Sequence, residues 1–449
     1  MRDHLHYPEL RQRVLSQKTL QPKLYGDVDF TAQPYRLATA PDDISSLPQR
    51  LADRSEILKD ERVIELMSTA TMLGDVVADP YATLMAEQSF KGLIDMLQLA
   101  CREGIDAVPA PPPELEAFIA SMEQRPAWLD MELVRQGQRV ERIPAAFLAP
   151  FATRGAFVAT FMNTYAALPM ALTGALGGRK ASRRVNETSA YFTTTALPGA
   201  LERYGPGFEA TAMVRLMHSM VRYNALKRSD QWDQSVYGIP VPQVDQMPAG
   251  LLNIYMLASR ARSKGRTEFT AAERAVVEFS RYRCFLLGLP EELLPQTIDG
   301  TLHYLHARAA VLRDDFDDAT CGELVRATMA AYLRADDTPF DRAAEAVEKS
   351  YSKAFFVRGF ANNDRKKAAA MGVSFGVSDV ARIAVTVPFV VGRMVAVTAA
   401  SKVPGLKHVA DSYAVRMLKK RLATYGAPEF TTDAATYKPV ARAAVPAAA

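Results

Sequence analysis

Three polar residues in the segment 215–222 have types and a spacing that suit chemistry. Arg215, His218 and Arg222 follow one another at i, i+3 and i+7, so on a helix they share one face, and most positions between them are apolar. Two interpretations fit this pattern. His218 is either a hydrogen-bonded core histidine whose neighbouring arginines pair with carboxylates elsewhere, or a ligand in a metal centre.

The distribution of histidines limits the kind of metal centre. His218 is the only histidine between His6 and His303, so no cluster of histidines can form locally around it. A single histidine ligand is typical of haem, because the porphyrin supplies four nitrogen ligands of its own. Buried haem propionates need cations. Arg215 and Arg222 are the candidates for that role, so a haem pocket is one interpretation of the segment, beside that of a hydrogen-bonded core histidine.

A second polar segment precedes the first by about thirty residues. Arg184, Glu187 and Thr188 fall at i, i+3 and i+4 on one face of a helix that we expect to begin near Ser182, after a glycine-rich stretch. Above an iron, these side chains could orient dioxygen, accept a proton and hold a water. The alternative is a solvated helix face with an ordinary Arg–Glu ion pair.

These segments belong to an ordered series of motifs: Pro126-Ala-Trp128-Leu-Asp130, Gly137-Gln138, Thr173-Gly174, Arg184-x-x-x-Thr188, Arg215-x-x-His218-x-x-x-Arg222 and Gly238-Ile-Pro240-Val-Pro242-Gln243-Val-Asp245. In order and spacing, the series resembles the bacterial rubber oxygenase (latex clearing protein) family and its wider relatives, which include the fungal haem oxygenase of mycophenolic acid biosynthesis. The resemblance is close over residues 126–256.

The resemblance implies an all-α fold: a globin-like helical core with additional N- and C-terminal helices. It also implies one noncovalent haem b, with His218 as the proximal ligand and Arg215 and Arg222 near the haem. Arg184 and Thr188 would lie on the distal side. The implied reaction is oxidative cleavage of carbon–carbon double bonds in a lipophilic, isoprenoid-like substrate by dioxygen.

Two departures from the rubber-cleaving branch concern the distal side. Glu187 stands where that branch carries a lysine, and a carboxylate is a poor replacement for an amine ligand. No acidic residue lies between Glu141 and Glu187, where that branch carries a distal glutamate. The resemblance therefore implies related chemistry on a substrate other than rubber, with Glu187 as a candidate proton acceptor.

Other classes of metal site fit the sequence less well than haem. Asp314, Asp315 and Asp318 match the Asp-Asp-x-x-Asp pattern with which terpene and prenyl synthases bind magnesium diphosphate, but the second magnesium motif is missing, and an acidic junction that caps the following helix explains them better. Glu-x-x-His pairs, which a di-iron bundle needs, are absent. His303 and His306 fit a helix face. A haem-binding or membrane-associated helical protein without turnover remains the non-enzyme alternative.

Composition sets further limits. The formal net charge of +4, without a long basic run, argues against nucleic acid as a partner. Three widely spaced cysteines indicate a reducing compartment, and the absence of Cys-x-x-Cys-His excludes covalent haem attachment through that motif. The N-terminus has no apolar signal core, so we expect a cytoplasmic protein.

The elements that must position these residues are predicted to be helices. We expect an extended arm over residues 1–50, a single helical haem-binding domain over 51–430, and a disordered tail over 431–449. The apolar stretch 143–178 is expected to be buried helix, with 156–172 lining a substrate channel. The apolar stretch 377–403 is interrupted by arginines and a proline, which favours peripheral contact with a membrane over a span.

Overall fold

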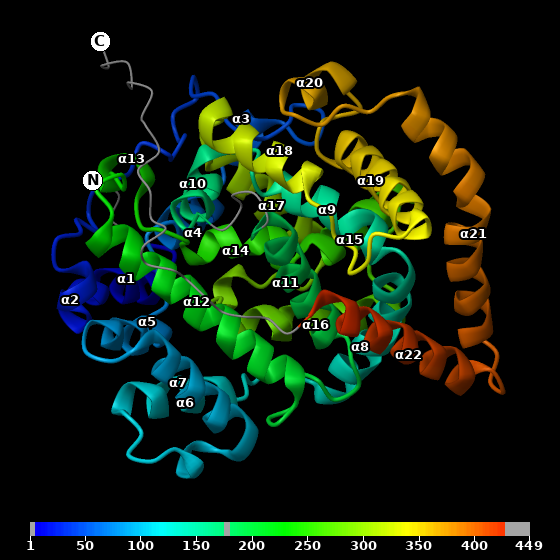
Figure 1. Ribbon diagram of the computed structural model, residues 1–449. Coiled ribbons are helices and arrows are strands. Elements are labelled where there is room, and N and C mark those ends of the chain that lie inside the picture. Colours follow the sequence, from blue (N-terminus) through cyan, green and yellow to red (C-terminus); the bar gives the residue numbers. More distant parts are fainter. Residues whose placement is uncertain (1–4, 175–179, 427–449) are drawn as a thin grey trace.

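The computed structural model describes residues 5–174 and 180–426, and the regular elements in these ranges are helical (Figure 1). Extended pairing within them is limited to two isolated bridges, Leu37 with Leu312 and Ser45 with Arg313. The expected all-helical fold is confirmed for the described residues. The tail predicted over 431–449 lies outside them.

The helices of the N-terminal half are α1 (Pro8–Leu20), α2 (Pro22–Tyr25), α3 (Arg54–Leu58), α4 (Glu61–Ala70), α5 (Ala78–Thr83), α6 (Phe90–Glu103), α7 (Pro113–Glu123), α8 (Met131–Phe147), α9 (Ala149–Ala159), α10 (Thr164–Leu172) and α11 (Lys180–Thr195). Those of the C-terminal half are α12 (Pro206–Arg228), α13 (Gln234–Tyr237), α14 (Gln243–Gly250), α15 (Leu252–Ser263), α16 (Ala271–Leu286), α17 (Ile298–Val311), α18 (Glu323–Ala330), α19 (Pro339–Gly359), α20 (Arg365–Ala370), α21 (Val377–Ser401) and α22 (Lys407–Tyr425). Short 3-10 turns and one π-helical turn, Asp318–Gly322, complete the set.

Residues 5–50, the described part of the extended arm that we expected over residues 1–50, are not extended throughout. They contain α1 and α2, and Leu10, Val14 and Leu24 are buried in the main apolar cluster of the molecule. Pro8 and Pro22 stand at the first positions of these helices, where a missing N–H costs nothing. This segment is therefore part of the core.

Helix α12 contributes side chains to two apolar clusters and carries the candidate histidine. Pro206 at its first turn favours helix initiation, and Lys227 and Arg228 in its last turn complement the helix dipole. Phe208, Leu216 and Met220 are buried against α5, α6 and α7. The helix is thereby fixed along most of its length.

The apolar stretch 143–178, expected to be buried helix, is divided into several helices in its described part. Helix α8 ends at Phe147, and α9 and α10 meet at an angle of 101°. The break has a local cause, because the Asn163 side chain accepts a hydrogen bond from the Tyr165 N–H and caps α10. Arg154 inside α9 is buried, donating to Glu345 at 2.5 Å and to two backbone carbonyls, so this stretch is core helix as expected.

Candidate functional site

His218 on α12 is held in one orientation by a chain of hydrogen bonds. Its Nδ1 atom lies 3.1 Å from Oε1 of Gln246. The Gln246 amide nitrogen donates to Oε1 of Gln243 at 2.5 Å, and the Gln243 amide nitrogen donates to the Gly74 carbonyl at 3.2 Å. Because the nitrogen of the Gln246 amide is engaged in this way, its oxygen faces the imidazole, and Nδ1 must carry the proton.

The other ring nitrogen is consequently an acceptor. Among the described residues, Nε2 of His218 has no hydrogen-bond partner, and its lone pair is available. Burial, with the positive charges of Arg222 and Arg184, lowers the pKa of His218 to about 4. The imidazole is therefore neutral at physiological pH, which is the form in which histidine binds metals.

The surroundings of His218 differ on its two sides. Val214, Met217 and Val221 share one face of α12 with the histidine and are half-buried, whereas Arg215 and Arg222 on the neighbouring face are buried. His218 lies at the boundary between these faces. The histidine therefore belongs to an apolar, partly accessible surface and not to the arginine face that the spacing predicted.

The two arginines of α12 are bound by carboxylates of this chain. Arg215 donates to both oxygens of Asp75, at 2.5 and 2.8 Å. Arg222 donates to Asp79 at 2.9 Å and to the Val241 carbonyl at 2.5 Å. All four charged side chains of these two pairs are buried. Both guanidiniums therefore pair with carboxylates of this chain. Their expected position near the haem stays a prediction.

A glycine makes this arrangement possible. Gly288 has a φ of +90°, and a Cβ there would lie 2.6 Å from Asp75 Oδ2 and 2.9 Å from Arg215 Nε. The backbone after α16 thus passes directly over the Asp75–Arg215 pair. Burial alone would raise the pKa of Asp75, but the Arg215 and Arg222 charges outweigh it and lower that pKa. The Asp75–Arg215 pair is an ionised structural contact.

The other predicted segment lies on α11, which packs against α12. Glu187 pairs with Arg184 at 3.5 Å and with Arg183 at 3.3 Å, and the Thr188 hydroxyl donates to the Arg184 carbonyl at 3.3 Å. Arg184 also contributes to the depressed pKa of His218, so its guanidinium lies within electrostatic reach of the imidazole. Ser182 is not the expected N-cap, since α11 already includes Lys180.

Glu141 is an interior carboxyl that the sequence did not single out. It lies on α8, and burial raises its pKa, against the charge of Arg283 and a hydrogen bond with Asn253. The Arg283 guanidinium stacks 4.9 Å from the ring of Phe192, which is one turn beyond Thr188 on α11. Only the packing of α8, α11 and α16 brings these groups together, so no spacing in the sequence could have revealed it.

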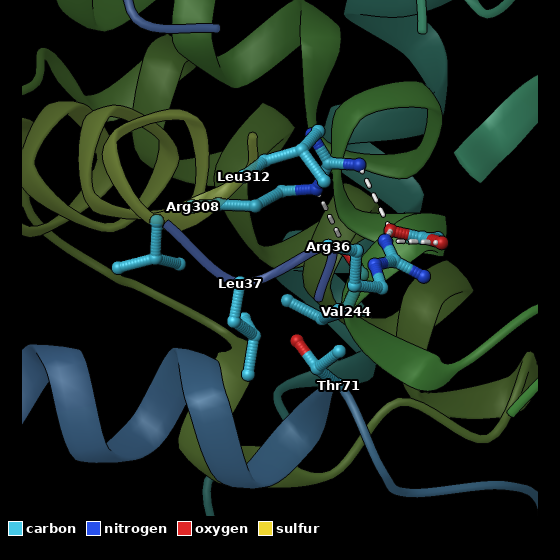
Figure 2. Close-up of a pocket in the computed structure, with 8 residues that line it drawn as sticks. Arg36, Leu37, Thr71, Val244, Arg308 and Leu312 are labelled. Carbon is cyan, nitrogen blue, oxygen red and sulfur yellow. Dashed lines mark hydrogen bonds and ion pairs between the residues drawn. The ribbon is translucent and has the colours of Figure 1, made fainter. Parts of the chain in front are cut away.

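Asp245, from the last motif of the series, stabilises the fold by binding two arginines. It accepts hydrogen bonds from Arg36 at 2.7 Å and from Arg308 at 3.0 Å (Figure 2). These arginines line a cavity of about 10 Å³, close to the least space that one water needs. The carboxylate joins the N-terminal segment to α17 and leaves no room for a substrate.

The competing metal sites do not assemble. In the described part of the chain, no group of three or more His, Cys, Asp or Glu side chains is placed to hold a metal ion. Asp318 pairs with Arg326, and Asp317 caps the helical turn that begins at Asp318, which is the junction expected for this acidic run. His303 and His306 have separate partners, Asp60 and Tyr255.

Comparisons with known proteins address the resemblance directly. No curated protein matches the chain. A solved structure of latex clearing protein LCP in the closed state superimposes with a TM-score of 0.55, over 79% of this chain and 91% of that chain, at 16% sequence identity. This likeness shows the fold. Residues 145–362, which include all six candidate residues, match the family described as ER-bound oxygenase mpaB/B'/Rubber oxygenase, catalytic domain. Residues 145–362 therefore correspond to the catalytic domain of the mpaB and rubber oxygenase family, and the chain has a fold like that of latex clearing protein.

Proposed function

We propose that this protein is a haem b-dependent oxygenase that acts on a lipophilic, unsaturated substrate and uses dioxygen to cleave a carbon–carbon double bond in an isoprenoid-like chain. The observation that carries the proposal is the state of His218. Its imidazole is neutral, and its Nδ1–H donates to Gln246. Its Nε2 atom, on a half-buried apolar face, has no hydrogen-bond partner among the described residues.

These properties fit a haem ligand. A metal-binding histidine commonly donates its second ring N–H to a carbonyl, carboxylate or water, which fixes the ring and raises its basicity. The Gln246 amide oxygen supplies that acceptor here. Since the described residues form no multi-ligand metal cluster around His218, the metal must bring further donors of its own, as a porphyrin does.

When bound, the haem would supply the redox chemistry with dioxygen. The chain's own groups would orient the reactants and protect them from water. Arg184 presents a cationic donor near His218, and Glu187 fixes that guanidinium by an ion pair within the same helix. The Thr188 hydroxyl, whose proton is held by the Arg184 carbonyl, is left with acceptor capacity for a water. On α11, Glu187 is the carboxylate that would hold a proton.

Helices α9 and α10 are the candidate lining for the substrate. Phe157 on α9, Phe161 in the turn between the two helices and Leu168 on α10 are buried, and α10 packs beside α12. Burying an isoprenoid chain against such side chains provides about 0.8 kcal/mol per methylene. Binding of a long apolar substrate would then depend on length more than on polar contacts, and the wall of α9 and α10 would exclude water from the reacting double bond.

The test is the absorption spectrum of protein purified after haem supplementation. Wild type should show a Soret band that His218→Ala abolishes, while His303→Ala, which removes a histidine already paired with Asp60, should keep it. A colourless wild-type protein that refuses haem would overturn the assignment. Oxygen consumption by the reduced protein with a polyprenyl lipid then separates an oxygenase from a haem-binding protein without turnover.

A further inference from the structure

Helix α21 lies along the outer edge of the molecule with one side uncovered (Figure 1). Its inner side packs on α8, α19 and α22: Met394 and Val397 join a cluster with Phe147, and Thr386 Oγ1 lies 3.1 Å from the Tyr351 hydroxyl. By length and composition it is the one single helix in the described ranges that could cross a membrane, yet none of its most apolar eighteen-residue window is buried.

The uncovered side of α21 is mostly apolar. Phe389 is 74% exposed and Val385 is 71% exposed. The other large apolar side chains exposed on α21, on the turn that follows it and at the start of α22 are Val377, Val380, Val387, Val395, Val403, Leu406 and Val409. Soluble monomers rarely leave such a continuous apolar surface open to water, so this side has a partner.

The charges around α21 identify the kind of partner. Residues 365–426 hold eleven Lys and Arg and two Asp, a formal net charge of +9, although the whole chain carries only +4. Exposed cations stand at both ends of the helix: Arg365, Lys366 and Lys367 on α20, and Lys402 just after α21 with Lys407 at the start of α22. The apolar side of α21 is therefore bordered by cations at each end.

The one arginine in the middle of the helix does not interrupt the apolar side. Arg393 is turned toward α8 and α22, where it donates to the Tyr413 hydroxyl and stacks 5.1 Å from the Phe147 ring. Arg382, nearer the start, pairs with Asp379 at 3.5 Å. The helix is thus amphipathic in a particular sense, with an apolar outer side and cations displaced to its ends.

We propose that α21 lies in the plane of an anionic lipid surface, with Val385 and Phe389 among the acyl chains and the lysines of the α20 and α21–α22 ends at the phosphate headgroups. A helix held along its length by three others is placed to lie on a bilayer and not to cross it. A second copy docking by the same side would bring two strongly positive surfaces together. Nucleic acid would satisfy the cations but not the valines and phenylalanine.

Flotation with vesicles tests this proposal independently of haem binding and turnover. The full chain should bind vesicles of phosphatidylcholine mixed equally with phosphatidylglycerol, bind phosphatidylcholine alone weakly, and be released by high salt. Phe389→Glu should weaken binding about tenfold or more. The variant loses an aromatic ring that would be buried in the bilayer and adds a negative charge that anionic headgroups repel. Leu20→Glu is the matched control, because Leu20 is 63% exposed on α1, at the opposite side of the molecule.

A second variant checks the electrostatic part. Lys402→Gln combined with Lys407→Gln should reduce binding to the anionic vesicles and leave the weak binding to phosphatidylcholine unchanged. Circular dichroism should show the same helicity in all variants, as the substituted side chains are exposed. Binding that resists alkaline carbonate extraction, a dimer that Phe389→Glu dissociates without any vesicle binding, or equal loss in Leu20→Glu would each overturn the proposal.

Discussion

The Nδ1 atom of His218 and the Oε1 atom of Gln246, 3.1 Å apart, define the state of the candidate iron ligand. Gln246 can offer only its oxygen, because its nitrogen donates to Gln243. This contact makes Nδ1 the protonated ring nitrogen and leaves Nε2 for a metal. Gln246 and Gln243 are therefore positioning residues for the proposed haem.

Replacing Gln246 tests this relationship. Gln246→Leu removes the acceptor and should weaken haem binding roughly 10–100-fold, the usual effect of losing a partner of a metal-bound histidine. Gln246→Glu restores a stronger acceptor and should recover binding with a more negative reduction potential. Haem titration and potentiometry measure both. Gln136→Leu, on the exposed side of α8, should change neither; unaltered affinity and potential in both Gln246 variants would refute the role.

The buried Arg222–Asp79 pair should act on stability. Arg222→Met leaves the Asp79 carboxylate unpaired in the core and should lower the free energy of unfolding by about 3–5 kcal/mol. The double variant Arg222→Met with Asp79→Leu removes both charges and should recover part of that loss. Urea unfolding measures both. If Arg222 instead served a propionate, its replacement would weaken haem binding while the apoprotein kept its stability.

Gly288 should be irreplaceable for a steric reason. Gly288→Ala places a Cβ 2.6 Å from Asp75 Oδ2 on a backbone with φ of +90°, and should destabilise the protein by about 1–3 kcal/mol. Gly265→Ala is the control, because Gly265 also has a positive φ, +70°, but its Cβ would meet nothing within 4 Å. The difference between the two variants in thermal unfolding isolates the clash with the Asp75–Arg215 pair.

The contacts of Asp245 with two arginines predict that the free energy of unfolding depends on pH. Burial opposes its ionisation, but Arg36 and Arg308 outweigh burial and hold its pKa below the ordinary value of 3.8. An acid whose folded pKa is depressed contributes stability above its unfolded pKa, and loses it as the pH falls through the folded pKa. Asp245→Asn should thus be destabilised at pH 7, by about 3–5 kcal/mol, and the gap to wild type should narrow below pH 3.8. Urea unfolding across this range would contradict the assignment if the gap stayed constant.

Glu187 should affect turnover and not haem binding. Glu187→Gln removes the carboxylate but keeps an amide oxygen for Arg184, so the Soret band should be unchanged while kcat falls roughly 10²–10⁴-fold, the range for loss of an acid–base group. Glu202→Gln, on an exposed turn, is the control. Full activity in Glu187→Gln, together with a loss in Glu141→Gln, would transfer the proton-accepting role to Glu141.

The sequence by itself determined the helical class, the helix that carries His218, the face shared by Arg184 and Glu187, and the family resemblance. Helical periodicity and short-range ion pairs are local properties, so spacing along the chain suffices for them. Glu187 pairs with Arg184 as an i, i+3 spacing predicts. The acidic run at 314–318 likewise caps the next helical turn, through Asp317.

Only the tertiary structure decided the partners of the buried charges. Asp75 and Asp79 precede Arg215 and Arg222 by 140 and 143 residues, and nothing local links them. Helices α1 and α2 are stabilised because their apolar residues pack into the core. Among the described residues, α8, α19 and α22 pack on the inner side of α21, and its outer side is left exposed. Long-range packing chooses which ion pairs form, since a buried charge takes whichever opposite charge the fold delivers. That packing gave Arg215 and Arg222 their carboxylate partners and His218 its partner, Gln246, while the place of the two arginines beside a haem stays a prediction.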